Sequence, residues 1–241
     1  MAIRDWPADQ RPREKLIRKG AGSLSDAELL AVFLRTGRPG KNAVDLARDA
    51  LMQFGSVSAL FAASFEQFST VNGFGEAKFA QMQAVLELAK RTLGETLREG
   101  ITLSSPKAVR DYLCLELGRK PYEVFFVLFL DSQNRLLEAR ELFRGTLSET
   151  SVYPREVVKA ALAANAAGVV FAHNHPSGIA EPTRADEVLT GTLINALALI
   201  GVRALDHFIV AGNQVYSFAE AGRLDSPQTA GAGMRAAGGS R

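Results

Sequence analysis

In the first hundred residues, apolar positions recur at intervals of three and four, the period of an α-helix that buries one face. The clearest series is Phe79, Met82, Leu86, Ala89 and Leu93. An earlier helix is predicted to begin after Ser25, an N-cap residue that is followed by an acidic first turn. Because this part of the chain shows no alternation of apolar and polar positions, it is predicted to be a small helical bundle.

Beyond residue 100, short apolar runs rich in β-branched and aromatic residues alternate with helical segments. Strands are predicted at residues 123–130, 135–143, 168–172, 204–211 and 214–218. Helices are predicted at residues 106–117, from residue 154 onward, and at residues 184–200. This order predicts a layered domain with a mixed sheet flanked by helices, so the fold class of the chain is α+β or α/β.

The change of pattern predicts three parts. Residues 1–99 form a helical domain, and residues 100–224 form the mixed-sheet domain. Residues 225–241 are rich in Gly, Ala and Ser, a composition that predicts a disordered tail.

Composition narrows the class of protein. The 241 residues are 47% hydrophobic and 22% charged, which is typical of a globular chain. The longest dense apolar run, residues 124–130, is too short to span a membrane, and no signal peptide is visible. The single cysteine, Cys114, excludes an internal disulfide framework. We therefore expect a cytoplasmic protein with no membrane partner.

Candidate metal chemistry is concentrated at one point of the chain. His173 and His175 follow a predicted buried strand, and residues two apart in extended backbone project from the same face. Thr183 is a natural N-cap, which would place Asp186 in the first turn of the next helix. Two imidazoles and one carboxylate with an open fourth position are typical of a hydrolytic zinc site. The alternative is a histidine pair that only caps a turn.

These residues also carry a family resemblance. The segment His173–Gly178 followed by Pro182–Asp186 resembles the JAB/MPN (JAMM) metalloprotease signature, H-x-H-P, six residues, S-x-x-D. The whole chain resembles the bacterial RadC family, whose members join a helix–hairpin–helix-type N-terminal region to such a domain. Further motifs that carry the resemblance are Arg11–Lys15, Leu24–Leu30, Asn72–Glu76, Arg144–Leu147, Tyr153–Glu156 and Leu205–His207.

The resemblance implies specific roles. His173, His175 and Asp186 would be ligands of Zn²⁺, and Glu123 would be the general base that takes a proton from the metal-activated water. From the residues alone, a solvated carboxylate at a strand end is the favoured interpretation of Glu123, and only the resemblance makes it the base. Glu156 is a competing carboxylate, but an acid is expected in the first turn of its helix anyway.

Thr183 departs from the family signature, which has a serine at this position. Its hydroxyl could bond the oxyanion or the metal-bound water, or it could only cap the helix. Asp206 and His207, on a predicted strand, could support the metal site, or His207 could be an ordinary core histidine.

The resemblance implies a JAMM-type zinc metallopeptidase that acts on a peptide or isopeptide bond of a peptide or protein substrate. One alternative is a DNA-associated protein, related to repair or recombination, with a structural metal or nuclease-type activity. Another is a catalytically idle interaction module. The sequence names neither the physiological substrate nor the oligomeric state.

The N-terminal domain supplies the reason for considering DNA. The turn Asn72–Gly75, followed by Lys78, resembles a helix–hairpin–helix turn, whose backbone amides can face a phosphate. Such binding would be weak and independent of DNA sequence. Glu76 lies where a phosphate would approach, and the net charge of the chain is only +2. A purely structural or protein-docking role for this domain therefore stays open.

Overall fold

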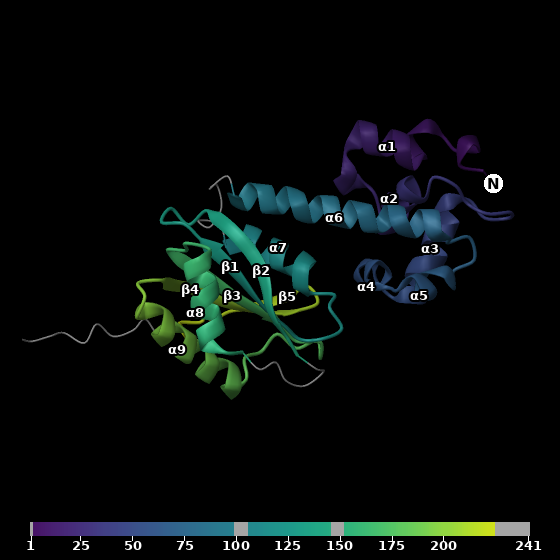
Figure 1. Ribbon diagram of the computed structural model, residues 1–241. Coiled ribbons are helices and arrows are strands. Elements are labelled where there is room, and N and C mark those ends of the chain that lie inside the picture. Colours follow the sequence, from purple (N-terminus) through teal and green to yellow (C-terminus); the bar gives the residue numbers. More distant parts are fainter. Residues whose placement is uncertain (1, 99–105, 146–151, 225–241) are drawn as a thin grey trace, which may run out of the picture. The chain divides into compact units, whose positions relative to one another are not determined.

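The computed structural model describes residues 2–98, 106–145 and 152–224, and the chain packs as two units, residues 1–91 and 92–241 (Figure 1). The predicted boundary at residues 99–100 and the predicted tail at residues 225–241 both lie outside the described residues. No helix within the described ranges is long and apolar enough to cross a membrane.

The first unit is helical, as predicted. Its helices are α1 (Pro12–Lys19), α2 (Asp26–Leu34), α3 (Ala43–Phe54), α4 (Val57–Ala62), α5 (Phe65–Ser69) and the larger part of α6 (Glu76–Arg98). Within its described residues, short 3₁₀ helices η1 (Ile3–Asp5), η2 (Ala8–Gln10) and η3 (Ala21–Ser23) lie near the N-terminus. Its core is built mainly from α2 and α3, with Phe68, Phe74 and Met82 packed against them.

Side-chain caps fix where these helices begin. Ser25 Oγ accepts a hydrogen bond from the backbone N of Glu28, which confirms the predicted N-cap of α2. Asn42 Oδ1 accepts from the backbone N of Val44 and of Asp45 at the start of α3. Gly55 ends α3 with φ +79°, a left-handed conformation that a residue with a Cβ adopts only with strain.

The second unit holds the mixed sheet. Its strands are β1 (Val124–Leu130), β2 (Leu136–Arg144), β3 (Gly168–Asn174), β4 (Arg203–Ala211) and β5 (Gln214–Ser217), in the order β2-β1-β3-β4-β5. Only β3 and β4 are parallel; the other neighbouring pairs are antiparallel. The helices of this unit are the end of α6 with α7 (Pro106–Leu117), α8 (Pro154–Ala163) and α9 (Arg184–Ala198).

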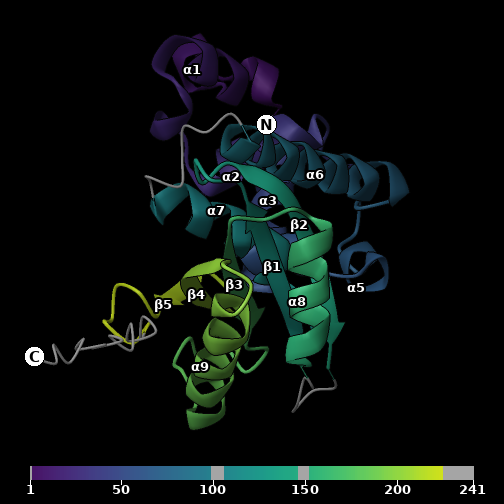
Figure 2. The same ribbon diagram turned by 60° about the vertical axis from the view of Figure 1, so that its left-hand side comes forward.

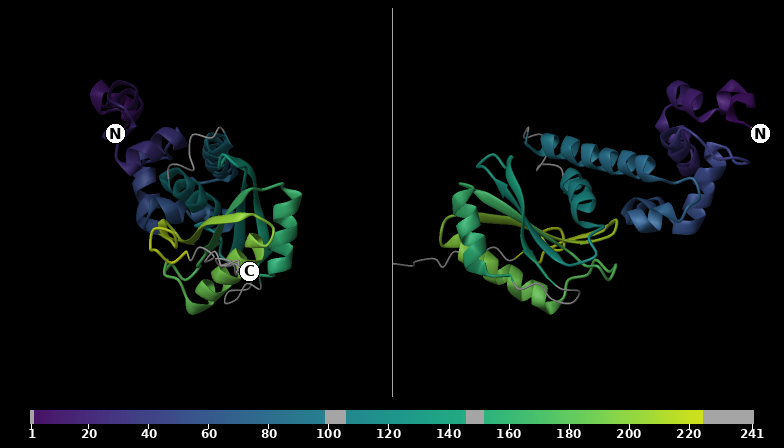
Figure 3. Two further views of the ribbon diagram at one scale, coloured as in Figure 1. Left: turned by 90° about the vertical axis from the view of Figure 1, so that its left-hand side faces the viewer. Right: turned by 45° about the vertical axis from the view of Figure 1, so that its right-hand side comes forward.

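Helices cover both faces of this sheet (Figures 2 and 3). On β1, Val124, Phe126 and Leu128 pack toward α7, whereas Phe125 and Val127 pack toward α8 and α9. Strand β3 divides its side chains between the two faces in the same way. Because both faces of these central strands are buried, β1 is apolar throughout and β3 is apolar up to His173, rather than alternating. The predicted fold class is thus confirmed.

Candidate metal centre

Strand β3 delivers two imidazoles to one face of the sheet. His173 lies in β3 and is 2% exposed, and His175 follows the strand end. The backbone N of His175 donates to the carbonyl O of Val210 at 2.8 Å, which continues the parallel pairing of β3 with β4. The Nε2 atoms of His173 and His175 are 2.9 Å apart. Both rings point to the face covered by α8 and α9, as the two-residue period requires.

Helix α9 brings a carboxylate to the same point. Asp186 Oδ1 lies 3.2 Å from His173 Nε2, and Asp186 Oδ2 lies 3.7 Å from His175 Nε2. Thr183 is the N-cap of α9, and both its backbone N (2.8 Å) and its hydroxyl (2.7 Å) donate to Asp186 Oδ2. Asp186 therefore lies in the first turn of the helix, as predicted, and its carboxylate is held in place by the capping residue.

The environment of Asp186 keeps its carboxylate charged. Burial acts to raise the pKa of this group, but the hydrogen bond and charge of His173 and the two bonds from Thr183 oppose burial and prevail. The pKa of Asp186 consequently lies below its ordinary value of 3.8. An ionised carboxylate beside two imidazoles is a donor set suited to a divalent cation.

A second carboxylate borders the histidines from β1. Glu123 immediately precedes this strand, and Phe125 pairs with His173 in the antiparallel register, so Glu123 comes level with His175. One carboxylate oxygen of Glu123 and one nitrogen of each histidine all lie within 4.8 Å of one another. Glu123, His173 and His175 thus form a group that could hold a metal ion, with Asp186 beside them.

Glu156, the competing carboxylate, and Asp206, a predicted support of the site, both lie outside this group. Glu156 is in the first turn of α8, where its carboxylate pairs with Lys159 Nζ at 3.0 Å. Asp206 accepts hydrogen bonds from the Ser217 hydroxyl at 2.6 Å and from the backbone N of Ala219 at 2.9 Å, and burial raises its pKa. Neither carboxylate is in the group around His173.

Asn174 is a structural residue of the site that sequence reasoning missed. Its side chain points to the opposite face from the two histidines. Asn174 Oδ1 accepts from the backbone N of Val124 at 2.8 Å, and Nδ2 donates to the carbonyl O of Tyr122 at 2.9 Å and of Lys120 at 3.2 Å. These bonds tie the segment on both sides of Glu123 to the strand end that carries the histidines. The sequence feature that could have identified Asn174 is its position, because a polar amide at the end of a predicted buried strand needs hydrogen-bond partners.

His207 contacts the metal centre directly. It is fully buried in β4, where its ring stacks on Phe218 and makes edge-to-face contacts with Phe125 and Phe171. Its Nε2 is 2.8 Å from His173 Nδ1. Burial, followed by the charge of His173, holds the pKa of His207 well below its ordinary value. The sequence left open whether His207 is an ordinary core histidine or supports the site. In the structure it is a core residue that also contacts His173, a proposed ligand.

In the first unit, the predicted hairpin turn is present. Gly73 has φ +96°, and Lys78 Nζ donates to the carbonyl O of Gly73 at 2.6 Å. The amine of Lys78 is therefore held against the turn. Desolvation lowers the pKa of this amine.

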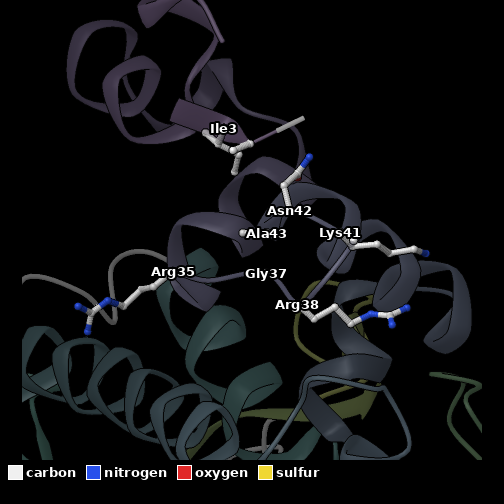
Figure 4. A pocket seen from close by; sticks show the side chains of 9 residues that line it. Ile3, Arg35, Gly37, Arg38, Lys41, Asn42 and Ala43 are labelled. Atoms are coloured by element: carbon white, nitrogen blue, oxygen red, sulfur yellow. The ribbon is translucent and has the colours of Figure 1, made fainter. Parts of the chain in front are cut away.

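A basic pocket of about 400 Å³ lies near the loop between α2 and α3 (Figure 4). The side chains of Arg35 and Arg38 point in different directions rather than toward one centre. Lys41 Nζ lies 2.5 Å and an Arg38 guanidinium nitrogen 4.0 Å from Asp49 Oδ2, so two of the cations there already share one carboxylate. The positive charges that line this pocket therefore do not converge on one point where a single anion could bind.

Comparison with known proteins shows the family to which this chain belongs. Residues 103–223 match the RadC-like JAB domain, and residues 3–80 match the UPF0758 N-terminal domain. The chain is 64% identical to a UPF0758 protein of Janthinobacterium sp. (strain Marseille), 63% to one of Herminiimonas arsenicoxydans and 61% to one of Nitrosomonas europaea. Each alignment covers 93% of this chain and the whole of the relative. The chain belongs to the RadC-like UPF0758 family, and the predicted resemblance is confirmed.

Proposed function

We propose that the chain is a zinc-dependent JAMM-type metallohydrolase that cleaves a peptide or isopeptide bond. One observation carries the proposal: the Nε2 atoms of His173 and His175 and the carboxylate of Asp186 converge, with separations of 2.9, 3.2 and 3.7 Å. Ligands placed about 2.0–2.1 Å from a tetrahedral ion are about 3.3–3.4 Å apart. The separations of the two nitrogens and of the nearer Asp186 oxygen to each, Oδ1 for His173 and Oδ2 for His175, scatter around this value, so the three side chains suit one zinc ion.

The protonation of His175 supports this fit. Its Nδ1 is 2.9 Å from the carbonyl O of Ile179, and a carbonyl can only accept a hydrogen bond, so Nδ1 carries the proton. In the neutral ring, Nε2 therefore presents its lone pair toward His173 and Asp186. At the 2.9 Å separation of the two Nε2 atoms, this lone pair is satisfied either by a proton on His173 Nε2 or by a cation that both nitrogens bind.

Glu123 is the residue best placed to move the proton. A zinc ion held by the three ligands would lower the pKa of a coordinated water to about 7. Within 4.8 Å of the histidine nitrogens, the Glu123 carboxylate is near enough to contact such a water. It would accept the proton of the attacking water and deliver it to the leaving amine. Glu123 is only partly buried, which leaves a substrate access to it.

Thr183 holds Asp186 in this proposal. Its hydroxyl proton is directed to Asp186 Oδ2, so the hydroxyl both caps α9 and orients the third ligand. Turned toward the substrate, the same hydroxyl would stabilise the oxyanion, the role of the serine that the family signature has here.

DNA binding by the first unit is a second proposal, and the hairpin turn around Gly73 favours it. In this alternative the metal is structural or serves a nuclease. Single- and double-stranded DNA are therefore included as substrates and ligands in every assay, over a series of salt concentrations.

The first test is metal content. We expect the purified protein to hold about one zinc ion per chain by elemental analysis. The His173→Ala/His175→Ala double variant should hold none, because it removes two ligand nitrogens. Protein that neither carries zinc nor takes it up in a titration would contradict the proposal.

The second test separates catalysis from metal binding. Glu123→Gln keeps the size of the side chain but removes its basicity, so it should retain zinc and lose at least about 100-fold in rate. The probes are internally quenched peptides of mixed sequence and an isopeptide between a glycine carboxyl and a lysine side chain. Glu156→Gln is the matched control. Full activity in Glu123→Gln would refute the assignment of the base.

A further inference from the structure

We propose that Thr190 and His207 are positioning residues that determine which ring nitrogen of His173 carries the proton. They place it on Nδ1, so that the Nε2 lone pair is available to the metal. This inference rests on the proposed function, because it concerns how the metal site is prepared. Neither residue reaches the ligand position itself, and both act through His173.

The contacts form a closed ring of buried groups. His173 Nδ1 is 2.8 Å from His207 Nε2, and His207 Nδ1 is 2.6 Å from Thr190 Oγ1. Thr190 Oγ1 donates in turn to the backbone carbonyl O of Asp186 at 2.6 Å. The side chain of Asp186 returns to His173 Nε2 at 3.2 Å. Two proposed ligands, His173 and Asp186, are therefore joined through Thr190 and His207 as well as directly.

Counting donors determines the direction of each bond. A hydroxyl has one proton, and that of Thr190 is used on the Asp186 carbonyl. Thr190 Oγ1 must then accept from His207, so the proton of the neutral His207 ring lies on Nδ1. His207 Nε2 is consequently an acceptor, and His173 Nδ1 carries the proton that it receives. The neutral His173 ring is left with its lone pair on Nε2, the atom that faces His175 and Asp186.

Hydrogen bonds in the opposite direction would prevent His173 from binding a metal. If the Thr190 hydroxyl donated to His207 Nδ1, the His207 proton would lie on Nε2 and point at His173 Nδ1. The proton of the neutral His173 ring would then be on Nε2, where it occupies the ligand lone pair. The bond between Thr190 and the Asp186 carbonyl is therefore what selects the metal-ready form.

Burial keeps water from substituting for these partners. His207 is fully buried and Thr190 is 2% exposed. The ring of His207 lies against Phe125, Phe171 and Phe218, so its two nitrogens depend on the partners described here. An ordinary core histidine would need partners as well, but not in the order that places a proton on His173 Nδ1 and so reserves Nε2 for the metal.

The test uses Thr190→Val, which removes the hydroxyl and keeps the shape of the side chain. Thr190→Ser is the conservative variant, because it restores the hydroxyl. Thr192→Val is the matched control: Thr192 lies on the same helix, and its hydroxyl makes the same bond to a carbonyl four residues back, Val188 at 2.8 Å, but at the surface. Zinc affinity is measured for each full-length chain by competition with a chromogenic chelator. The imidazole protons are located by ¹⁵N NMR of the metal-free protein.

We expect Thr190→Val to weaken zinc binding by about 10- to 100-fold. Thr190→Ser and Thr192→Val should bind as the wild-type chain does. In the wild-type spectrum, His207 should carry its proton on Nδ1, and Thr190→Val should change that pattern. Unaltered zinc affinity in a folded Thr190→Val chain, or a wild-type His207 protonated on Nε2, would overturn this inference alone. Failure of the wild-type chain to bind zinc would instead overturn the proposed function, and this inference with it.

Discussion

At the scale of single residues, three consecutive side chains at the end of β3 serve two faces of the sheet. His173 and His175 face α9 and the metal centre, while Asn174 faces the other way and binds the backbone before and at the start of β1. The alternation of a strand thus lets one short segment carry two ligands and also hold the neighbouring strand that carries Glu123. Asn174 is 2% exposed and its bond to the backbone N of Val124 is buried, whereas its bonds to the Tyr122 and Lys120 carbonyls are partly buried.

This arrangement predicts the effect of Asn174→Ala. The backbone N of Val124 loses its acceptor, and the carbonyls of Tyr122 and Lys120 lose their donor. Leaving buried polar groups unpaired should lower the free energy of unfolding by about 1–3 kcal/mol. The amide of Val124 should also lose its protection in hydrogen exchange. The control is Ser177→Ala, in the exposed turn after His175. Undiminished protection of Val124 would show that Asn174 does not hold this segment.

The residues of the site differ in how far the sequence could reveal them. His173, His175 and Asp186 could be predicted because a two-residue spacing and an N-cap place them locally. Asn174 and Thr190 could not, because neither lies near its main partner in the chain: Val124 is 50 residues from Asn174, and His207 is 17 from Thr190. Contacts of this kind follow from strand order and register, which the sequence pattern alone leaves undetermined.

At the scale of secondary-structure elements, α2 begins where a capping box meets an ion pair. The backbone N of Ser25 donates to Glu28 Oε2 at 2.8 Å, and Lys15 Nζ from α1 lies 2.9 Å from the same carboxylate. The hydrogen bond from Ser25 lowers the pKa of Glu28, burial opposes it, and Lys15 lowers it further. The net result is a pKa below the ordinary value of 4.5.

The lowered pKa predicts a pH-dependent effect of Glu28→Gln. Glutamine can still accept from Ser25, so the variant loses mainly the charge interaction with Lys15, and the first unit should be destabilised by about 1 kcal/mol at pH 7. A carboxylate whose pKa is depressed in the folded state stabilises the protein above its unfolded value and loses this contribution as the pH falls through the folded value. The difference between wild type and variant should therefore shrink below pH 4.5.

The single tryptophan gives the measurement for Glu28. Trp6 packs against the core of the first unit, so its fluorescence during urea unfolding reports on that unit. Glu14→Gln is the control, because the Glu14 carboxylate is more exposed and lies 3.6 Å from Arg11. A destabilisation by Glu28→Gln that stays constant down to acid pH would contradict the role of the charge.

Predicted and observed elements agree closely, and the deviations have a cause. The strand predicted at residues 168–172 continues through Asn174, so His173 lies within β3 rather than after it. His and Asn have no strong preference for strands, and this extension depends on pairing with Ile209 and Val210 of β4. A single sequence pattern shows the apolar part of a strand, but not how far its neighbour prolongs it.

At the scale of the whole molecule, the boundary between the two units is harder to predict from the sequence than the individual helices and strands. The helical stripe that begins at Phe79 continues without a break to Leu93, yet the packing changes along it. Phe79 packs against the core of the first unit, and Leu93 and Leu97 pack against α7 and the sheet of the second. Periodicity shows that a helix has an apolar face but not which core receives each part of it. The units therefore divide between Arg91 and Thr92, within α6.

Two separate cores predict that metal binding stabilises the molecule unevenly. All the proposed ligands belong to the second unit, on β3 and α9, with Glu123 beside β1. A ligand that binds only the folded state stabilises it by about 2.7 kcal/mol when its concentration is 100 times the dissociation constant. Hydrogen exchange should therefore show amides of β1, β3 and α9 slowed by zinc, by up to about 100-fold, while those of α2 and α3 exchange at unchanged rates. The His173→Ala/His175→Ala chain should show neither effect. Equal slowing in both units would mean that they unfold together, and slowing confined to α2 and α3 would place the zinc in the first unit and contradict the assignment of the ligands.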